Sequence, residues 1–181
     1  KSTLLKLLFG AERCSHGEVL VDQRNLASVG REGVAELRRQ LGVIFQDYKL
    51  LPRRTVLDNV AYGLEVLGVN VRERRRLAML LLHAMGLQDR ADAFPITLSG
   101  GEQQRVAVAR ALIHKPKMVL ADEPTGNLDS ANANELHQLF IKLRNEFNQS
   151  FLIVTHNQDL AKKSDRILQM KDGKIEKELL A

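Results

Sequence analysis

The sequence predicts an α/β fold, in which helices cover a mainly parallel sheet and a helical subdomain is inserted near the middle of the chain. Short aliphatic runs alternate with segments of helical periodicity, most regularly in the last third of the chain. The middle third is mostly helical in pattern. At 181 residues, with 44% hydrophobic and 27% charged residues, the chain has the size and composition of one globular domain with a substantial core.

Five short aliphatic segments are expected to form strands. They are residues 17–21, 41–45, 118–121, 151–155 and 166–170. Seven segments with apolar residues at helical spacing are expected to form helices. They are residues 4–9, 34–39, 56–67, 72–85, 102–113, 131–146 and 158–163. Turn residues at 171–174 predict a closing hairpin. We therefore expect a single domain over residues 1–181, with a helical subdomain at about 55–115.

Composition excludes several classes of protein. The longest apolar runs are far too short to span a bilayer, and no charged leader with an apolar core opens the chain, so we expect a protein that is neither secreted nor membrane-spanning. Cys14 is the single cysteine, which rules out an internal disulfide. Two tyrosines, six phenylalanines and no tryptophan leave few stacking platforms for single-stranded nucleic acid.

The net charge of +5 has its densest cluster at Arg72, Arg74, Arg75 and Arg76. These arginines begin a predicted helix, where such a cluster is most often a solvated face. The same cluster would also suit a surface near anionic lipid or an acidic partner loop. The sequence leaves both interpretations open.

Two motifs in the second half of the chain point to phosphate chemistry. In 98–105, Leu-Ser-Gly-Gly-Glu-Gln-Gln-Arg, a serine and two glycines end a loop and open a helix, so unhindered N–H groups and the positive end of the helix dipole can face an anion. Downstream, an apolar strand ends in Asp122 and Glu123, which suit a magnesium ion and a water beside a phosphate. Together they predict nucleoside triphosphate hydrolysis.

The first residues, Lys1, Ser2 and Thr3, stand at the head of a leucine-rich helical segment. They resemble the end of a phosphate-binding loop, in which the lysine reaches the outer phosphates and the hydroxyl binds magnesium. The glycines that come before the lysine in that motif are absent. We therefore expect a strand-rich segment and most of the loop to precede Lys1 in the native protein.

These motifs resemble those of the ATP-binding subunit of ABC transporters, in family order and over essentially the whole chain. The matching elements are 1–3 with the end of Walker A, Gln46 with the Q-loop, 98–103 with the signature, 118–123 with Walker B, 126–129 with the D-loop and His156 with the H-loop. The resemblance implies the ABC type of P-loop NTPase fold, ATP hydrolysis, and ATP and Mg²⁺ as bound species.

The resemblance also implies a role for each matched residue. In the family Glu123 polarises the attacking water, His156 contacts the γ-phosphate, and Gln46 senses it. Two subunits face head to tail, so the signature of one closes over the ATP of the other. The implied metal ligands are Ser2, Gln46 and Asp122. The implied ATP-binding residues are Lys1, Ser2, Thr3, Ser99, Gly100, Gly101, Glu102 and Asp129.

Within the family, residues 45–51, 54–60 and 94–95 resemble the cell-division ATPase FtsE most. Residues 120–129 are similar in the lipoprotein-release subunit LolD and the macrolide exporter subunit MacB, and the carboxy-terminal part resembles the lipoprotein-release group more. FtsE is favoured, which implies an FtsX-like membrane partner, a homodimer on ATP binding, a peripheral location on the cytoplasmic face of the bacterial inner membrane, and no direct contact with nucleic acid. A lipoprotein-release or export permease is the alternative partner.

A non-transport ATPase of the SMC or Rad50 type is a distant alternative. In that class a long coiled coil separates Walker A from the signature. Here Lys1 and Ser99 are separated by one compact stretch without sustained heptads, which disfavours that class.

Overall fold

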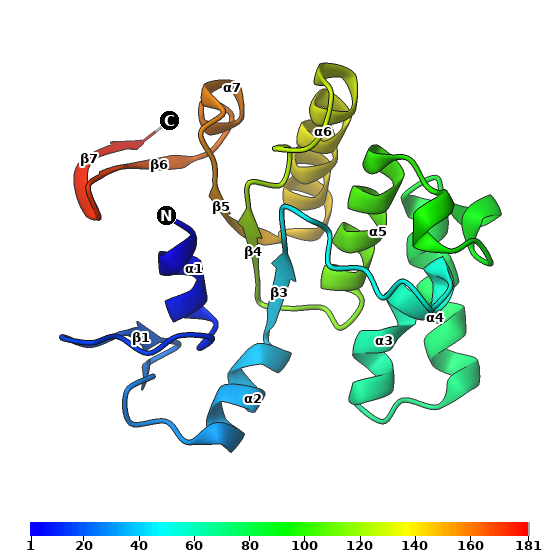
Figure 1. Ribbon diagram of the computed structural model, residues 1–181, viewed down its shortest axis with the longest axis horizontal. Helices are drawn as coiled ribbons and strands as arrows, with labels where there is room; N and C mark the ends of the chain where they lie inside the picture. The colour runs from blue at the N-terminus through cyan, green and yellow to red at the C-terminus, as the bar shows by residue number, and fades with distance from the viewer. Residues whose placement is uncertain (181) are drawn as a thin grey trace.

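A parallel three-stranded sheet lies at the centre of the molecule (Figure 1). The computed structural model describes residues 1–180. The sheet has the order β3-β4-β5, formed by β3 (Leu41–Ile44), β4 (Met118–Asp122) and β5 (Ser150–Val154). Met118 of β4 pairs with Leu41 on one side and Ser150 on the other, so the three strands end at the same edge. The α/β fold with a parallel sheet is confirmed.

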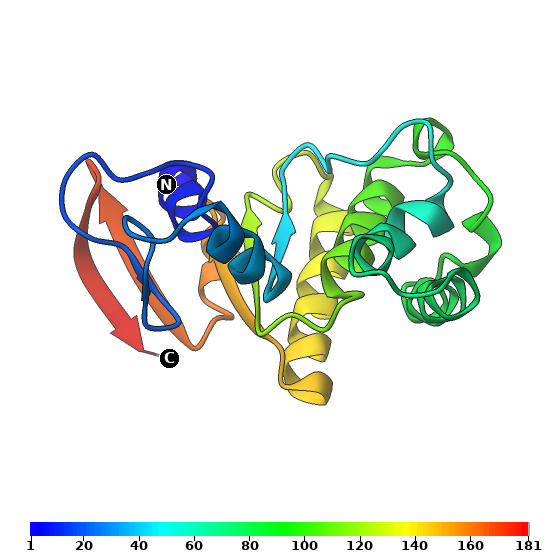
Figure 2. The same ribbon diagram turned by 90° about the horizontal axis from the view of Figure 1, so that it is seen from below.

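The two faces of the sheet belong to different cores. Leu120 packs in a cluster with residues of α1 (Ser2–Leu8) and α2 (Arg31–Arg39), whereas Val119 and Ala121 pack in the larger cluster with α5 (Gly100–Leu112) and α6 (Ser130–Phe147). This is the side-chain alternation expected of a strand buried on both faces. Accordingly α1 and α5 lie on opposite sides of the sheet (Figures 1 and 2).

Between β3 and α5 the chain forms α3 (Val56–Val66) and α4 (Val71–Ala84), followed by 3₁₀ turns at Gln88–Arg90 and Pro95–Thr97. Thr55 caps α3 by accepting a hydrogen bond from the Asp58 N–H, and Asn70 caps α4 in the same way. The apolar face of α3 is buried against α5. This helical group lies at the far side of the molecule from α1 (Figure 2).

Two small antiparallel sheets complete the fold: β1 (Leu20–Val21) with β2 (Arg24–Asn25), and β6 (Arg166–Lys171) with β7 (Lys174–Leu180). The hairpin predicted at 171–174 is present. Its two loop residues, Asp172 and Gly173, have φ of 48° and 79°, as a type I′ turn requires. The helix α7 (Gln158–Ala161) precedes β6.

The strand predicted at 17–21 is wrong over most of its length, because the strand there comprises only Leu20 and Val21. Their turn to β2 uses Asp22 and Gln23, both with positive φ. The other predicted strands and helices are present, with ends displaced by a few residues. Within residues 1–180 no helix is both long enough and apolar enough to cross a bilayer.

Candidate functional site

The carboxyl end of β4 presents two carboxylates in different directions. Asp122 is the last residue of the strand, and Glu123 follows it with a φ of 44°, in the left-handed region. The Glu123 N–H still donates to the Val154 carbonyl, at 2.9 Å, so the turn stays attached to β5. The sharp turn allows the two neighbouring side chains to contact different elements, one on α1 and one after β5.

Asp122 faces the start of α1. The Ser2 hydroxyl donates to Asp122 Oδ1 at 2.9 Å, and Lys1 Nζ donates to the Thr155 carbonyl after β5, at 3.2 Å. Leu5, one turn further along α1, is buried against the sheet and so fixes the helix there. Thr3 is exposed at the same end. A cavity of about 270 Å³ lies beside Ser2 and Asp122.

Glu123 faces the residue after β5. His156 Nδ1 lies 2.9 Å from Glu123 Oε2, and the His156 N–H donates to the same oxygen at 3.3 Å. The carboxylate side chain is 17% exposed, whereas the imidazole is 77% exposed. A shielded carboxylate with one accessible basic neighbour can accept a proton from a water placed beside it.

Gln46, two residues after β3, contacts the loop that follows Glu123. The Asn127 side-chain N–H₂ donates to the Gln46 carbonyl at 2.9 Å, and Gln46 Nε2 lies 3.4 Å from Asn127 Oδ1. Gly126 lets the amide approach, because a Cβ there would be 3.1 Å from Gln46 Nε2. Gln46 is thereby tied to the same loop as the two carboxylates.

The predicted anion-binding helix start is α5, and its first turn is closed by a capping box. The Glu102 N–H donates to the Ser99 hydroxyl at 3.3 Å, and the Ser99 N–H donates to the Glu102 carboxylate at 2.8 Å. That backbone N–H, with a smaller contribution from Arg90, holds the pKa of Glu102 below its ordinary value. The Ser99 N–H, one of the free donors at this helix end, is thus already bonded to the Glu102 carboxylate.

Asp129 caps α6 and touches the signature indirectly. Its carboxylate accepts from the Asn132 N–H at 2.8 Å and from the Asn132 side chain, which lowers the pKa of Asp129. Asn132 in turn packs on Gly101, where a Cβ would lie 2.1 Å from the Asn132 Oδ1. Only glycine fits at position 101 without a movement of the Asn132 side chain.

The predicted residues therefore form two groups. The first, at the edge of the sheet, comprises Lys1, Ser2, Thr3, Gln46, Asp122, Glu123 and His156. The second comprises Ser99, Gly100, Gly101, Glu102 and Asp129. In the described part of the chain no hydrogen bond joins a residue of one group directly to a residue of the other.

Sequence reasoning missed several polar residues, buried or partly buried, that connect these groups. Gln104 of α5 is fully buried and donates to the Pro124 carbonyl, directly after Glu123, at 2.6 Å. Arg110 of the same helix and Asn59 of α3 bind the loop after β3. The sequence does show a polar residue at a helix position that the apolar spacing predicts to be buried. It does not show which backbone group that side chain contacts.

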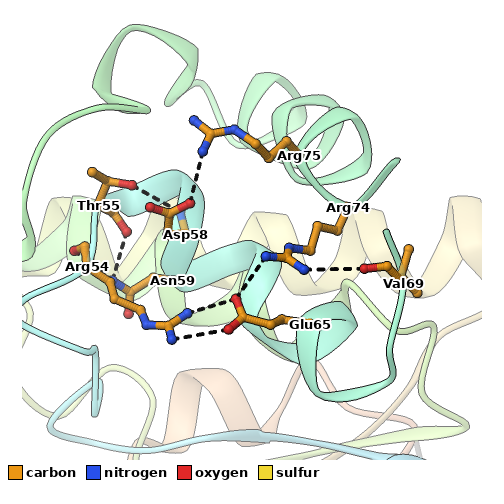
Figure 3. Close-up of polar contacts among 8 residues, drawn as sticks. All are labelled: Arg54, Thr55, Asp58, Asn59, Glu65, Val69, Arg74 and Arg75. Carbon is orange, nitrogen blue, oxygen red and sulfur yellow. Dashed lines mark hydrogen bonds and ion pairs between the residues drawn. The ribbon is translucent and has the colours of Figure 1, made fainter. Parts of the chain in front are cut away.

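Three of the four clustered arginines form ion pairs within the helical group, and Figure 3 shows two of them, Arg74 and Arg75. Arg74 pairs with Glu65, which Arg54 also contacts, and Arg75 pairs with Asp58. Arg76 pairs with Glu73 on its own helix. The structure thus explains three of the four arginines as partners of acidic residues on α3 and α4.

The sequence and structure were compared with those of known proteins. A family model described as ABC transporter matches residues 1–126. The lipoprotein-releasing system ATP-binding protein LolD of Bacteroides fragilis is 46% identical over 176 residues, which are 97% of this chain and 82% of that protein. The cell division ATP-binding protein FtsE of Streptococcus pneumoniae is 41% identical over 176 residues, covering 97% of this chain and 76% of that protein.

A solved structure, described as the dimeric post-hydrolysis state of an ATP-binding cassette bound to ADP and Pi, superimposes with a TM-score of 0.89. It shares 35% sequence identity, and the match covers 99% of this chain and 79% of that chain. At this coverage the match includes the sheet and the helical group. The chain belongs to the ABC transporter family, as a domain that binds and hydrolyses ATP.

Proposed function

We propose that ATP is held at the amino end of α1 and hydrolysed at the carboxyl end of β4. Lys1 lies at the start of α1 and supplies a compact cation with three N–H donors for the outer phosphates. Ser2 and Thr3 follow it in the first turn, where free backbone N–H groups favour an anion. The observation that carries the proposal is the convergence of Ser2, Asp122, Glu123 and His156 at this one edge.

The residues at this edge fit a magnesium ion. Mg²⁺ prefers oxygen ligands in an octahedron of radius about 2.0–2.1 Å, which sets neighbouring ligands about 2.9 Å apart. The Ser2 hydroxyl and Asp122 Oδ1 are 2.9 Å apart. These two residues, together with Gln46, would hold the ion. When bound, it would neutralise charge on the phosphate oxygens.

Glu123 would act on the attacking water. Its carboxylate accepts the water proton as the water oxygen bonds to the γ-phosphorus and the bond to ADP breaks. His156 holds the carboxylate through two contacts with Oε2 and leaves the other oxygen, Oε1, for the water. The exposed imidazole would contact the γ-phosphate, as its 77% exposure allows.

The second group of residues acts on the ATP of another copy of the chain. Ser99, Gly100, Gly101 and Glu102 open α5 and would close over that nucleotide in a head-to-tail homodimer, with Asp129 beside them. The separation of the two groups within this chain supports this arrangement, as does the dimeric state in which the similar cassette was solved.

Glu123→Gln tests the assignment. Hydrolysis should fall by at least about 10²-fold, because a positioned base is removed, while ATP binding persists and an ATP-bound dimer accumulates. The matched control is Glu135→Gln, an exposed glutamate of α6 that pairs with Arg105. Turnover by the Glu123→Gln protein equal to that of the control would refute the assigned role.

We further propose that the chain powers an integral membrane subunit in lipoprotein release, from the cytoplasmic face of a bacterial inner membrane. The greater identity to LolD, 46% in Bacteroides fragilis, supports this over the 41% to FtsE. The loop after Gln46 and the helical subdomain at 55–115, within a single ATPase domain, would receive the membrane partner. Cell division with an FtsX-like partner is the second candidate, supported by the FtsE-like pattern of residues 45–51 and 54–60.

The membrane partner separates the two candidates. The full-length protein is purified from its native membrane with ATP, and the integral membrane protein that comes with it is identified. Recovery of a permease together with bound lipoprotein supports the release function. A partner without lipoprotein, whose depletion blocks division, would replace it with the cell-division function.

A further inference from the structure

We propose that Arg110 is a positioning residue that couples the loop after β3 to the signature helix. Residues 45–55 are here called the Gln46 loop. Through Arg110, a movement of Gln46 at one ATP site would displace Ser99 and Gly100, which face the other ATP site of the dimer. The inference rests on the function proposed above and adds a link between its two groups of residues.

The Gln46 loop contains a backbone conformation that needs external support. Tyr48 and Lys49 are consecutive, and their φ values are 59° and 49°. Residues with a side chain seldom adopt the left-handed region, and two in succession persist only where the surrounding structure holds them. The groups that hold this pair therefore control the path of the loop.

Arg110 holds this pair from outside the loop. Its guanidinium donates to the Lys49 carbonyl at 2.6 Å and to the Tyr48 carbonyl at 2.7 Å. Burial lowers the pKa of Arg110, and no carboxylate within residues 1–180 forms an ion pair with it. The partly buried cation is thus directed at two backbone carbonyls. The planar fork of arginine bridges them in a fixed geometry, which the single flexible ammonium of a lysine does not reproduce.

The same loop also reaches the opposite end of α5. Gly100 and Arg110 are ten positions apart, which spans about 15 Å of helix. At Gly100 an added Cβ would lie 3.0 Å from the Tyr48 hydroxyl oxygen. Tyr48 therefore contacts the signature turn through its side chain and Arg110 through its carbonyl. The loop and the helix are in contact at two well-separated points.

The two ends of the Gln46 loop are held as well. At its far end, the Asn59 amide donates to the carbonyls of Arg54 and Thr55 (Figure 3). It also donates to the Leu51 carbonyl and accepts from the Leu51 N–H at 2.7 Å. At its near end, Gln46 is tied to Asn127. A displacement of Gln46 is therefore passed to α3 and α5 and is not absorbed within the loop.

Arg110→Lys tests this link, with Arg38→Lys as the matched control. Arg38 of α2 also donates to two consecutive carbonyls, Phe9 and Gly10, both at 3.0 Å, but it lies outside the proposed path. The milder Tyr48→Phe removes only the hydroxyl near Gly100. The full-length proteins are compared by amide hydrogen exchange without nucleotide and by ATP turnover.

Arg110→Lys should speed amide hydrogen exchange both at residues 47–50 and at residues 99–102. Tyr48→Phe should speed it at residues 99–102 alone. The turnover number of Arg110→Lys should fall about tenfold while half-saturating ATP changes less than about twofold, because the lost contact aligns the signature in the reacting state and not the bound nucleotide. Arg38→Lys should change neither the exchange at 47–50 and 99–102 nor the turnover number.

Faster exchange confined to 47–50 would overturn the proposed link, and so would unchanged turnover. A parallel loss of ATP affinity, turnover and thermal stability would show a merely structural role and overturn it too. Absence of hydrolysis by the unaltered protein would instead refute the proposed function, while the exchange at 99–102 would still decide whether Arg110 joins the loop to the helix.

Discussion

At the scale of single residues, Glu102 gives α5 a charged cap. Its carboxylate is 19% exposed and accepts the Ser99 N–H, which is the main reason that its pKa lies below the ordinary value of 4.5. Because the folded pKa is lowered, the ionised carboxylate stabilises the fold above pH 4.5, and this stabilisation is lost as the pH falls through the lowered pKa.

Glu102→Gln should therefore lower the free energy of unfolding by roughly 0.5–1 kcal/mol at neutral pH, since glutamine keeps the cap geometry but not the charge. The difference should shrink as the pH is lowered, because a protonated glutamate resembles glutamine. Urea unfolding over a pH series measures it. Glu146→Gln on α6 is the control, and a pH-independent difference at position 102 would contradict this account.

Residues in short motifs could be predicted individually. Lys1, Ser2, Asp122 and Glu123 follow from the end of a phosphate loop and from a strand that ends in two carboxylates. Arg110 could not be predicted, since its partners are backbone carbonyls more than sixty positions away in a left-handed pair. No pattern in the sequence marks which carbonyls adopt that geometry.

At the scale of elements, the contact between β3 and α5 depends on a glycine, Gly42, whose lack of a side chain lets the strand and the helix approach closely. A Cβ at Gly42 would lie 2.5 Å from the Ala111 carbonyl oxygen and 3.2 Å from its carbon. Both atoms belong to helix backbone, so neither can move without shifting α5.

Gly42→Ala should destabilise the protein by about 1–3 kcal/mol, as overpacking of a rigid contact does. The urea midpoint measures the loss. At Gly30 no atom lies within 4 Å of an added Cβ and φ is −71°, so Gly30→Ala should change the midpoint far less. Equal midpoints for the two variants would show that α5 can move away from β3 at little cost.

The elements that periodicity predicted best are those buried on a broad face, such as α5 and β4. The bounds of β1 and the presence of β2 could not be predicted, because each strand has two residues and Leu20 is 64% exposed. With so little burial, the turn at Asp22 and Gln23 fixes the pairing more than any apolar pattern. The helical periodicity of 102–113 likewise gave no information on the loop that packs beside it.

At the scale of the whole molecule, the two groups of site residues predict complementation between inactive chains. Lys1→Ala removes the phosphate contact at the first group. Ser99→Asp keeps a good helix cap but places a negative charge where the second group would meet the phosphate of a partner. Each variant alone should hydrolyse ATP poorly.

Mixing the two variants should restore up to about one quarter of the unaltered rate, because random pairing makes half of the dimers mixed and each mixed dimer has one intact site of two. Steady-state ATP hydrolysis of the mixture measures this, with each variant at the same total concentration as reference. A mixture no more active than its components would place both groups of residues at the same site of one chain.

The left-handed turn at Glu123 has a consequence for the history of such a sequence under selection. Asparagine or glycine would adopt a φ of 44° with less strain than glutamate, a difference of about 1 kcal/mol. Selection for heat resistance alone would thus favour replacing the one carboxylate that we propose meets the water. Stability and turnover therefore place opposite demands on the residue at this position.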